Sequence, residues 1–219
     1  MRIAFHQPNY LPNLSFFHKM QQVDLFVIPT KLQFVRREWH SRAKVMGNGG
    51  DIMLTIPVTG SNRQALSDAR VEETAKWPRK HRQTLEMCYR KCIKDESLDR
   101  ILAPYQKEMK SDYLTAFTLE LIVIMKDLLG VETKLVVDSE VEGQKHELLI
   151  NLCEKYNAHE YLSGLGGKQY MDEEYVECIR RKGITHQFVD RSIAAEFPYS
   201  AAHYLCHHGA SATRAMIAD

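Results

Sequence analysis

One stretch decides the fold, IAFHQPNYLPNLSFFHKMQQVDLFVI at residues 3–28. Its first three residues form an apolar run that predicts a buried strand, and Pro8 and Pro12 prevent regular strand pairing beyond His6. Residues 14–22 place apolar side chains at near-helical spacing behind Asn13, which is suited to cap a helix. Residues 24–28 predict a second buried strand. Together these segments predict a βαβ unit and therefore a parallel sheet.

The rest of the chain continues this alternation around two additions. A segment of mixed aromatic and basic residues at 33–45 and an apolar segment at 52–56 flank a glycine-rich turn at 47–50 and predict a hairpin. Two helices are predicted next, at 78–94 and 99–129. Strands and helices then alternate at 133–137, 146–156, 159–163, 175–181 and 185–189. We therefore predict an α/β fold with a three-layer, mostly parallel Rossmann-like sheet, a small hairpin and a mainly helical insertion at about residues 75–130, in a single domain of residues 1–219.

Charge and composition exclude several classes of partner. The 29 basic and 28 acidic side chains nearly cancel, so we expect no nucleic-acid partner, although a local basic cluster can hold a small anionic substrate such as a nucleotide or nucleotide sugar. The longest apolar stretch, at residues 119–125, is too short to cross a bilayer, which predicts no membrane insertion and a cytoplasmic location. Five cysteines without a CxxC pair indicate a reducing compartment. The sequence identifies neither a cofactor nor an oligomeric state.

The loop after the first predicted strand is the strongest candidate site, because open α/β sheets bind ligands at the carboxyl ends of their strands. A helix that begins beside this loop supplies unpaired amides suited to phosphate or carboxylate. The two histidines of the loop can donate to phosphate or move protons, which makes them catalytic candidates. The alternative is a buried, hydrogen-bonded His6 and a surface His18. The candidate residues are His6, Gln7, Asn9, Tyr10, His18 and Lys19.

A second candidate site is the basic segment that precedes the predicted turn. Guanidinium groups bind phosphate or carboxylate through two parallel hydrogen bonds, so this segment can form an anion clamp. The alternative is a solvated strand face, because alternate residues of one strand point to opposite sides and cannot all converge. The candidate residues, interleaved with Phe34 and Trp39, are Gln33, Arg36, Arg37 and Arg42.

A third candidate site is the glycine-rich loop that follows the strand predicted at 159–163. Small residues let a backbone approach a ligand closely, and an adjacent lysine and a downstream helix are typical of loops that bind phosphate. The loop matches neither a Walker A motif nor a full GxGxxG motif, and a tight turn remains the alternative. The candidate residues are Ser163, Gly164, Gly166, Gly167, Lys168 and Tyr170.

The remaining metal-ligating and nucleophilic residues are predicted to be structural. His203 and His207 are four residues apart and can share a helix face, but no matching carboxylate or cysteine pair accompanies them. Cys88 and Cys92 have the same spacing and no companion base. We therefore predict no metal site.

Several long strings resemble one family in order and spacing. They are HQPNYLPNLSFFHKM, VDLFVI, LQFVRREWHSR, LTIPV, LGVETKLVV and HEYLSGLGGKQYMD, and together they resemble the WbqC-like proteins over about residues 1–190. The resemblance implies a bacterial protein of a kind often encoded with genes for O-antigen, part of lipopolysaccharide, or for other surface polysaccharides. The sequence departs from the family pattern at Asn13 and Ser15, where Trp and Gly are common, at Thr30 and Lys31, which replace an acidic pair, and in the His-rich segment 197–209. These departures indicate a changed substrate or a weakened enzyme.

A second likeness concerns architecture alone. A strand, His6, a proline-rich loop and His18 on a following helix resemble the HIGH-type site of nucleotidyltransferases and class I synthetases, which have a HUP-like sheet. By this analogy both histidines stabilise charge at a phosphorus centre and Lys168 supplies a second cation. The spacing is longer than in the HxGH motif, so the likeness is an analogy.

Two functions of different class follow. The first is a transferase that acts on a nucleotide-linked sugar or on an activated acyl or aminoacyl group. The alternative is a non-catalytic ligand-binding or scaffolding component of a polysaccharide-assembly complex, which the lack of a triad or Walker motif favours. A third, metal-dependent hydrolysis, would use His203 and His207.

Overall fold

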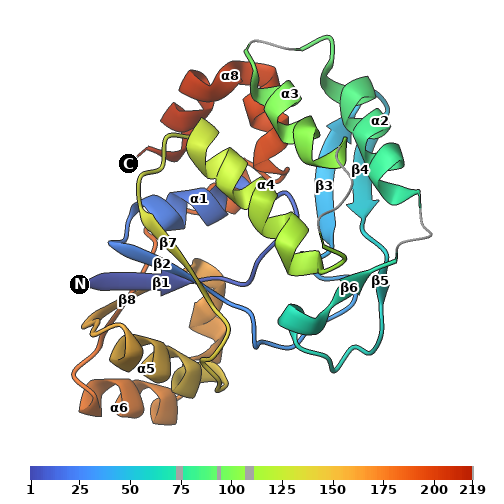
Figure 1. Cartoon of the computed structure of the whole chain (residues 1–219). Helices are drawn as coiled ribbons and strands as arrows, with labels where there is room; N and C mark the ends of the chain where they lie inside the picture. The colour runs from blue at the N-terminus through green and yellow to red at the C-terminus, as the bar shows by residue number, and fades with distance from the viewer. Residues whose placement is uncertain (73–75, 93–94, 107–110, 219) are drawn as a thin grey trace.

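A parallel sheet forms the centre of the computed structural model, which describes residues 1–72, 76–92, 95–106 and 111–218, without the side chains of 169 and 170 (Figure 1). Within these residues the sheet has five strands in the order β7-β2-β1-β8-β9. The strands are β1 (Arg2–Phe5), β2 (Leu25–Pro29), β7 (Lys134–Asp138), β8 (Glu160–Ser163) and β9 (Thr185–Phe188). The chain thus moves outward from β1 to β7 and later returns to the other side of β1, so the strand order reverses between β1 and β8.

Helices cover both faces of this sheet. Alternate residues of a strand point to opposite faces. Ala4 and Phe26 therefore join the core under α1 (Leu14–Gln21) and α4 (Leu114–Leu128). Ile3 and Val27 join a second core under α5 (Lys145–Lys155) and α6 (Glu173–Arg181). Figure 1 shows the two helix pairs on opposite sides of the strands. The structure confirms the predicted three-layer, Rossmann-like α/β fold.

A long excursion separates β2 from β7. It contains the predicted hairpin, formed by β3 (Arg42–Gly47) and β4 (Gly50–Thr55), and a second small pair, β5 (Val58–Thr59) and β6 (Arg70–Val71). The hairpin is confirmed, but its first arm is shorter than the predicted 33–45. Residues 33–41 form a loop instead, because Phe34 N–H bonds to Gln64 O at 2.9 Å and so pairs outside the hairpin.

The helix predicted at 99–129 is wrong as a single element. It divides into α3 (Ser97–Leu102), a short 3₁₀ turn η2 (Ala103–Tyr105) and α4. Pro104 lies at the break and has no amide hydrogen to continue the helix. Tyr113 is extended and pairs with Arg70 of β6 instead, and Val71 N–H donates to Asp112 O at 2.7 Å. The other helix of this region, α2 (Trp77–Tyr89), ends before the predicted residue 94, and residues 93–94 lie outside the described part.

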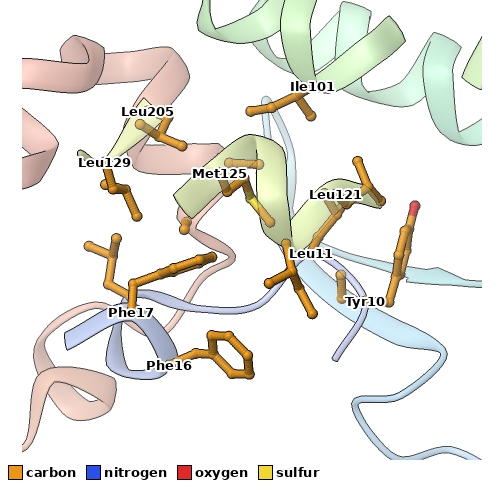
Figure 2. Packing of buried hydrophobic residues seen from close by; sticks show 14 of the residues in the cluster. Tyr10, Leu11, Phe16, Phe17, Ile101, Leu121, Met125, Leu129 and Leu205 are labelled. Atoms are coloured by element: carbon orange, nitrogen blue, oxygen red, sulfur yellow. The ribbon is translucent and has the colours of Figure 1, made fainter. Parts of the chain in front are cut away.

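The larger core joins α1 and α4 to the C-terminal helix α8 (Ala201–Ile217). Figure 2 shows Phe17, Met125 and Leu205, one from each helix, in a single cluster with Tyr10 and Leu11. Burying a side chain of this size contributes about 1.5 to 3 kcal/mol.

The excursion adds its own aromatic residues to this core. The ring of Trp77, which is 4% exposed, lies 5.1 Å from that of Phe117 in α4, centroid to centroid. The helices around α1 are therefore packed tightly enough to fix the loop that leads into it. Among the described residues, no helix is long and apolar enough to cross a bilayer.

Candidate functional site

A cavity of about 680 Å³ opens at the carboxyl ends of β1 and β8. The strand order reverses between these two strands, and ligands of open α/β sheets bind in the crevice at such a switch point. The lining of this switch-point cavity includes the end of β1, the middle of α1, the loop at residues 32–35, the glycine-rich loop after β8, the start of α5 and Tyr175 of α6. The fold thus brings together residues that are far apart in the sequence.

His6 lies at the end of β1, where its backbone N–H donates to Val27 O at 3.1 Å. Nδ1 of its ring donates to Gln7 O at 2.9 Å, and because a carbonyl oxygen accepts, this bond assigns the proton to Nδ1. No described residue is recorded as a partner of Nε2, which is therefore available as an acceptor. Burial, followed by the charge of Lys19, lowers the pKa of His6 to about 3, although its ring is only half-buried. The imidazole is neutral at physiological pH.

Lys19 projects from α1 into the same cavity and is 7% exposed. Its Nζ donates to Phe5 O at 2.9 Å and lies 5.6 Å from the centroid of the Phe26 ring. No aspartate or glutamate is among the described residues that line the cavity. Burial lowers the pKa of Lys19 to about 7. The cavity thus contains a buried amine that no described lining residue neutralises.

The loop after β8 forms another wall and leads into a 3₁₀ turn, η3 (Leu165–Tyr170). Gly164 has φ −70°, and Gly166 has no positive φ, so neither backbone requires glycine. A Cβ added to either residue would meet no atom within 4 Å. Gly167 differs, since its Cβ would lie 2.9 Å from Ser163 Oγ. Neither packing nor backbone conformation therefore requires glycine at 164 or 166, and both positions leave open space beside the cavity.

The start of α5 supplies a further wall through Gly143, Gln144 and Lys145. The first-turn amides of a helix lack intrahelical acceptors and favour an anion. Gly143 has φ +122°, and a Cβ there would lie 2.9 Å from Leu148 N, so only glycine fits. Lys145 has φ +49°, a left-handed backbone that is strained for a side chain of this kind.

Asp138 holds the segment that leads to this helix. Its Oδ1 accepts from the backbone N–H groups of Glu140 and Val141 at 2.9 and 2.8 Å. Its Oδ2 lies 2.8 Å from Lys155 Nζ and accepts from Tyr156 Oη at 2.7 Å. Burial opposes ionisation of this carboxyl, but these hydrogen bonds outweigh it and hold its pKa below the usual value. Asp138 is thus a positioning residue for the α5 wall.

Apolar and aromatic side chains form the remaining wall of the cavity. Phe5 and Tyr161, from neighbouring strands, have ring centroids 5.3 Å apart, and Leu148, Leu149 and Tyr175 extend this surface onto α5 and α6. Ligand sites commonly combine such a wall with a few polar groups that fix orientation. The cavity suits a ligand with a negatively charged group and an apolar or aromatic part.

Eight of the residues predicted from the sequence line this cavity, and they come from all three predicted sites: His6, Gln7, Lys19, Gln33, Ser163, Gly164, Gly166 and Gly167. The predicted clamp does not converge. Arg36 donates to Gly60 O at 2.8 Å, and Arg42 donates to Arg37 O at 3.3 Å, outside the lining.

The other predicted residues lie elsewhere. Lys168 is exposed, with Nζ 5.3 Å from the centroid of the Phe188 ring, and Asn9 is half-buried outside the lining. The side chain of Tyr170 lies outside the described residues. Of the residues that depart from the family pattern, Thr30 is buried and Lys31 is exposed.

Tyr10 belongs to the core rather than to the cavity. It is 1% exposed, and its hydroxyl hydrogen-bonds to His81 Nδ1 at 2.9 Å and to Tyr105 Oη at 2.6 Å. Figure 2 shows its ring among apolar side chains. These bonds satisfy a buried hydroxyl.

His18 is buried, at 1% exposed, rather than on the helix surface. Its Nδ1 donates to Ile217 O at 3.0 Å, so its Nε2 accepts, and Gln22 Nε2 donates to it at 2.8 Å. Both ring nitrogens are thus engaged: Nδ1 joins α1 to the end of α8, and Nε2 accepts from the last turn of α1 itself.

The His-rich segment lies on α8. The rings of His203 and His207 have centroids 4.5 Å apart and both lie against the Tyr89 ring. In the described ranges no group of three His, Cys, Asp or Glu side chains is arranged to hold a metal ion.

Comparison with known proteins places the chain in a family. The model of the WbqC-like protein family matches residues 7–208. A protein of Mycobacterium tuberculosis (strain ATCC 25618 / H37Rv), described as uncharacterized protein Rv1507c, is 30% identical over 176 residues, which cover 78% of this chain and 76% of that protein. No solved structure matches the chain. The match over most of the chain shows that it belongs to the WbqC-like protein family.

Proposed function

We propose that the chain is a transferase whose donor carries phosphate, most simply a nucleotide-linked sugar, and that this donor binds in the switch-point cavity. The observation that carries the proposal is Lys19, a buried amine with no acidic partner on the lining of the cavity. A buried charge without a partner is costly, and proteins retain such groups mainly at functional sites. A bound phosphate would supply the missing counter-charge.

Two other walls support a phosphate at this position. The start of α5 lines the cavity, and the first amides of a helix bind phosphate well. Gly164 and Gly166 leave room for a ligand to approach the backbone of their loop. The three features line one cavity although Lys19 precedes the other two by more than 100 residues in the sequence.

The apolar wall fits the other part of such a donor. A nucleobase can pack against Phe5, Tyr161 and Tyr175, and so can the acyl chain of an activated acyl or aminoacyl donor. We favour the nucleotide-linked sugar because the family resemblance implies surface-polysaccharide (O-antigen) biosynthesis. On the same ground we propose that the protein acts in the bacterial cytoplasm.

The decisive experiment measures donor binding directly. Uridine, guanosine and thymidine diphosphates, their sugar conjugates and coenzyme A thioesters would be titrated into the wild type, Lys19→Met and Lys31→Met by calorimetry and thermal shift. Lys31 is exposed and does not line the cavity, so Lys31→Met is the matched control. We expect one donor class to bind the wild type and the control. At a hundred times its dissociation constant it should stabilise them by about 2.7 kcal/mol, and the effect should be lost in Lys19→Met. Failure of all these ligands to bind the wild type would reject the proposal.

A non-catalytic binding role is the second candidate, and one observation favours it. The described lining of the cavity offers no carboxylate as a general base, and both ring nitrogens of His18 are engaged in the core. The two roles differ in turnover. A donor that binds wild-type protein and is released unchanged in the presence of a broad set of acceptors, with no free nucleotide formed, would favour the binding role.

A further inference from the structure

A second cavity, of about 240 Å³, lies beside the first. It shares four lining residues with the switch-point cavity: His6, Lys19, Gly164 and Gly166. The rest of its lining includes Ser15 and His18 of α1, and Ser192 and Ala194 of the segment after β9. We call it the side cavity. The two cavities meet at the imidazole and the amine described above.

We propose that the side cavity is the acceptor site of the transfer reaction, where a small, uncharged, hydroxyl-bearing molecule donates a hydrogen bond to Nε2 of His6. The inference rests on the proposed transferase function and specifies its second substrate. It follows from the size of the side cavity, the charges around it and the shared wall.

The size of the side cavity limits the acceptor to a small molecule. At about 30 Å³ for each water molecule in the liquid, a volume of about 240 Å³ holds roughly eight waters. The switch-point cavity is almost three times larger. A donor with a base and phosphates therefore fits the switch-point cavity, and a molecule of about a dozen non-hydrogen atoms or fewer fits the side cavity.

The charges around the side cavity favour an uncharged acceptor. Arg191 is already paired, with Nε and Nη2 donating to Glu196 at 2.9 and 2.5 Å. Lys19 is the other cation of the lining, and the described lining contains no carboxylate that would attract an ammonium group. The hydroxyl of Ser192 makes no capping bond, and that of Ser15 donates to Asn13 Oδ1, which leaves its own oxygen as an acceptor. Hydroxyl groups of a ligand match these partners.

The wall between the cavities permits the two substrates to meet. Gly164 and Gly166 line both cavities and carry no side chain to separate them. A Cβ on either glycine would project into space with no atom within 4 Å. His6 borders both cavities as well, with Nδ1 bonded to Gln7 O and Nε2 left as an acceptor. A hydroxyl bound at Nε2 thus lies beside the position proposed for the donor phosphate.

The transfer step balances with these groups. The acceptor oxygen forms a bond to the anomeric carbon of the donor sugar, and the bond from that carbon to the phosphate oxygen breaks. The electron pair of the broken bond leaves with the nucleoside diphosphate, whose charge the protonated amine of Lys19 stabilises. The hydroxyl proton passes to Nε2 of His6 and from there to water. The charge of Lys19 is, after burial, a cause of the low pKa of His6, so a diphosphate that neutralises Lys19 makes His6 a stronger base in the loaded site.

Two substitutions separate the cavities. Ala194 lines only the side cavity and Val35 only the switch-point cavity, and both are exposed enough to accept a larger side chain. The probes are uridine diphosphate and a panel of glycerol, myo-inositol and glucose, with ethanolamine as the charged match. Saturation-transfer NMR would be recorded for the wild type, Ala194→Trp, Val35→Trp and His6→Phe, after thermal melting has shown which variants fold.

We expect at least one polyol to bind the wild type and Val35→Trp and to lose at least fivefold in affinity in Ala194→Trp and His6→Phe. Ethanolamine should give no signal. Equal polyol binding in wild type and Ala194→Trp, or no polyol binding to the wild type, would overturn the proposed acceptor site. Uridine diphosphate tests the donor site separately. If Ala194→Trp abolishes polyol binding but the protein binds no nucleotide or acyl donor, the side cavity is a polyol site and the proposed donor is rejected.

Discussion

Two buried charges lie at the carboxyl ends of strands in one sheet, and their surroundings are opposite. Asp138, at the end of β7, receives two backbone hydrogen bonds, a tyrosine hydroxyl and an ammonium group. Lys19, beside the end of β1, donates to a carbonyl oxygen and lies over the Phe26 ring, and no Asp or Glu is among the described residues that line its cavity. A buried charge whose hydrogen-bonding positions are all occupied by the protein itself indicates a structural role. A charge that the fold leaves unpaired indicates a ligand, because its burial otherwise only destabilises the protein.

The largest expected loss of stability comes from replacing Asp138, the buried charge that the protein pairs. Asp138→Ala leaves Lys155 and Tyr156 without their shared acceptor and releases the segment before α5. Breaking a buried pair costs about 3 to 5 kcal/mol, and Lys155 is one third exposed, so we expect a loss of about 3 kcal/mol in the free energy of unfolding. Urea denaturation would measure it.

Glu140→Ala serves as the control for this substitution. Glu140 pairs with the same Lys155 but is 81% exposed, and exposed pairs contribute at most about 1 kcal/mol. Equal losses in the two variants would show that the burial of Asp138 has no special importance.

Replacing Lys19, the buried charge without a described acidic partner, should instead raise the free energy of unfolding. Lys19→Met removes a buried charge and keeps an unbranched side chain, so we expect it to stabilise the protein at pH 7 by about 2 kcal/mol. The pKa of Lys19 is about 7 in the folded protein against 10.5 for the free side chain. Between these values the unfolded chain binds more protons, so the stability of the wild type rises with pH by at most about 1.4 kcal/mol per unit.

The gain of Lys19→Met is therefore largest at and below pH 7 and disappears toward pH 10. Urea denaturation of both proteins at pH 6, 7, 8, 9 and 10 would follow it, with Lys31→Met expected to track the wild type because Lys31 is exposed. A destabilised Lys19→Met at pH 7 would mean that this amine contributes to folding and would weaken the case for a ligand there.

The smallest effects separate two glycines of the loop after β8. Gly166→Ala places a methyl group in open space and should change stability by no more than about 0.5 kcal/mol. Gly167→Ala brings its Cβ to 2.9 Å from Ser163 Oγ and should cost about 1 kcal/mol. The affinity for the donor should follow the opposite order, with a larger loss in Gly166→Ala than in Gly167→Ala. Thermal melting and calorimetry would measure both quantities, and a strongly destabilised Gly166→Ala would show that this glycine serves packing.

The sequence predicted the fold well because its strands are short, apolar and separated by clear loop signals. The stretch at 3–28 predicted β1, α1 and β2 to within one residue at each end. The helix predicted at 99–129 failed because one apolar periodicity continued across Pro104 and Tyr113. Tyr113 is extended because it pairs with β6, and such tertiary pairing has no local signal in the sequence. The small pair β5 and β6 had no signal, since two-residue strands lack a measurable period.

The candidate site was predicted in part. Proximity to a strand end found His6, Lys19 and the glycine loop, all of which line the switch-point cavity. The direction in which each side chain of α1 points was not predictable. Lys19 points into the switch-point cavity, whereas the adjacent His18 hydrogen-bonds to the end of α8. The α5 wall was missed because the strand order, which no local pattern reveals, places residue 143 on the same cavity as residue 6. The glycine at 143 before a predicted helix was the available signal.

The burial of Trp77 has a spectroscopic consequence. The chain has two tryptophans, and the other, Trp39, is 50% exposed on the loop whose Gln33 and Val35 line the switch-point cavity. Trp77 should emit at shorter wavelength and resist quenching by acrylamide, whereas Trp39 should emit like the free indole and be quenched readily. Trp39→Phe and Trp77→Phe would therefore give two single-fluorophore proteins, one whose emission follows the packing of the excursion and one whose emission follows events at the mouth of the cavity.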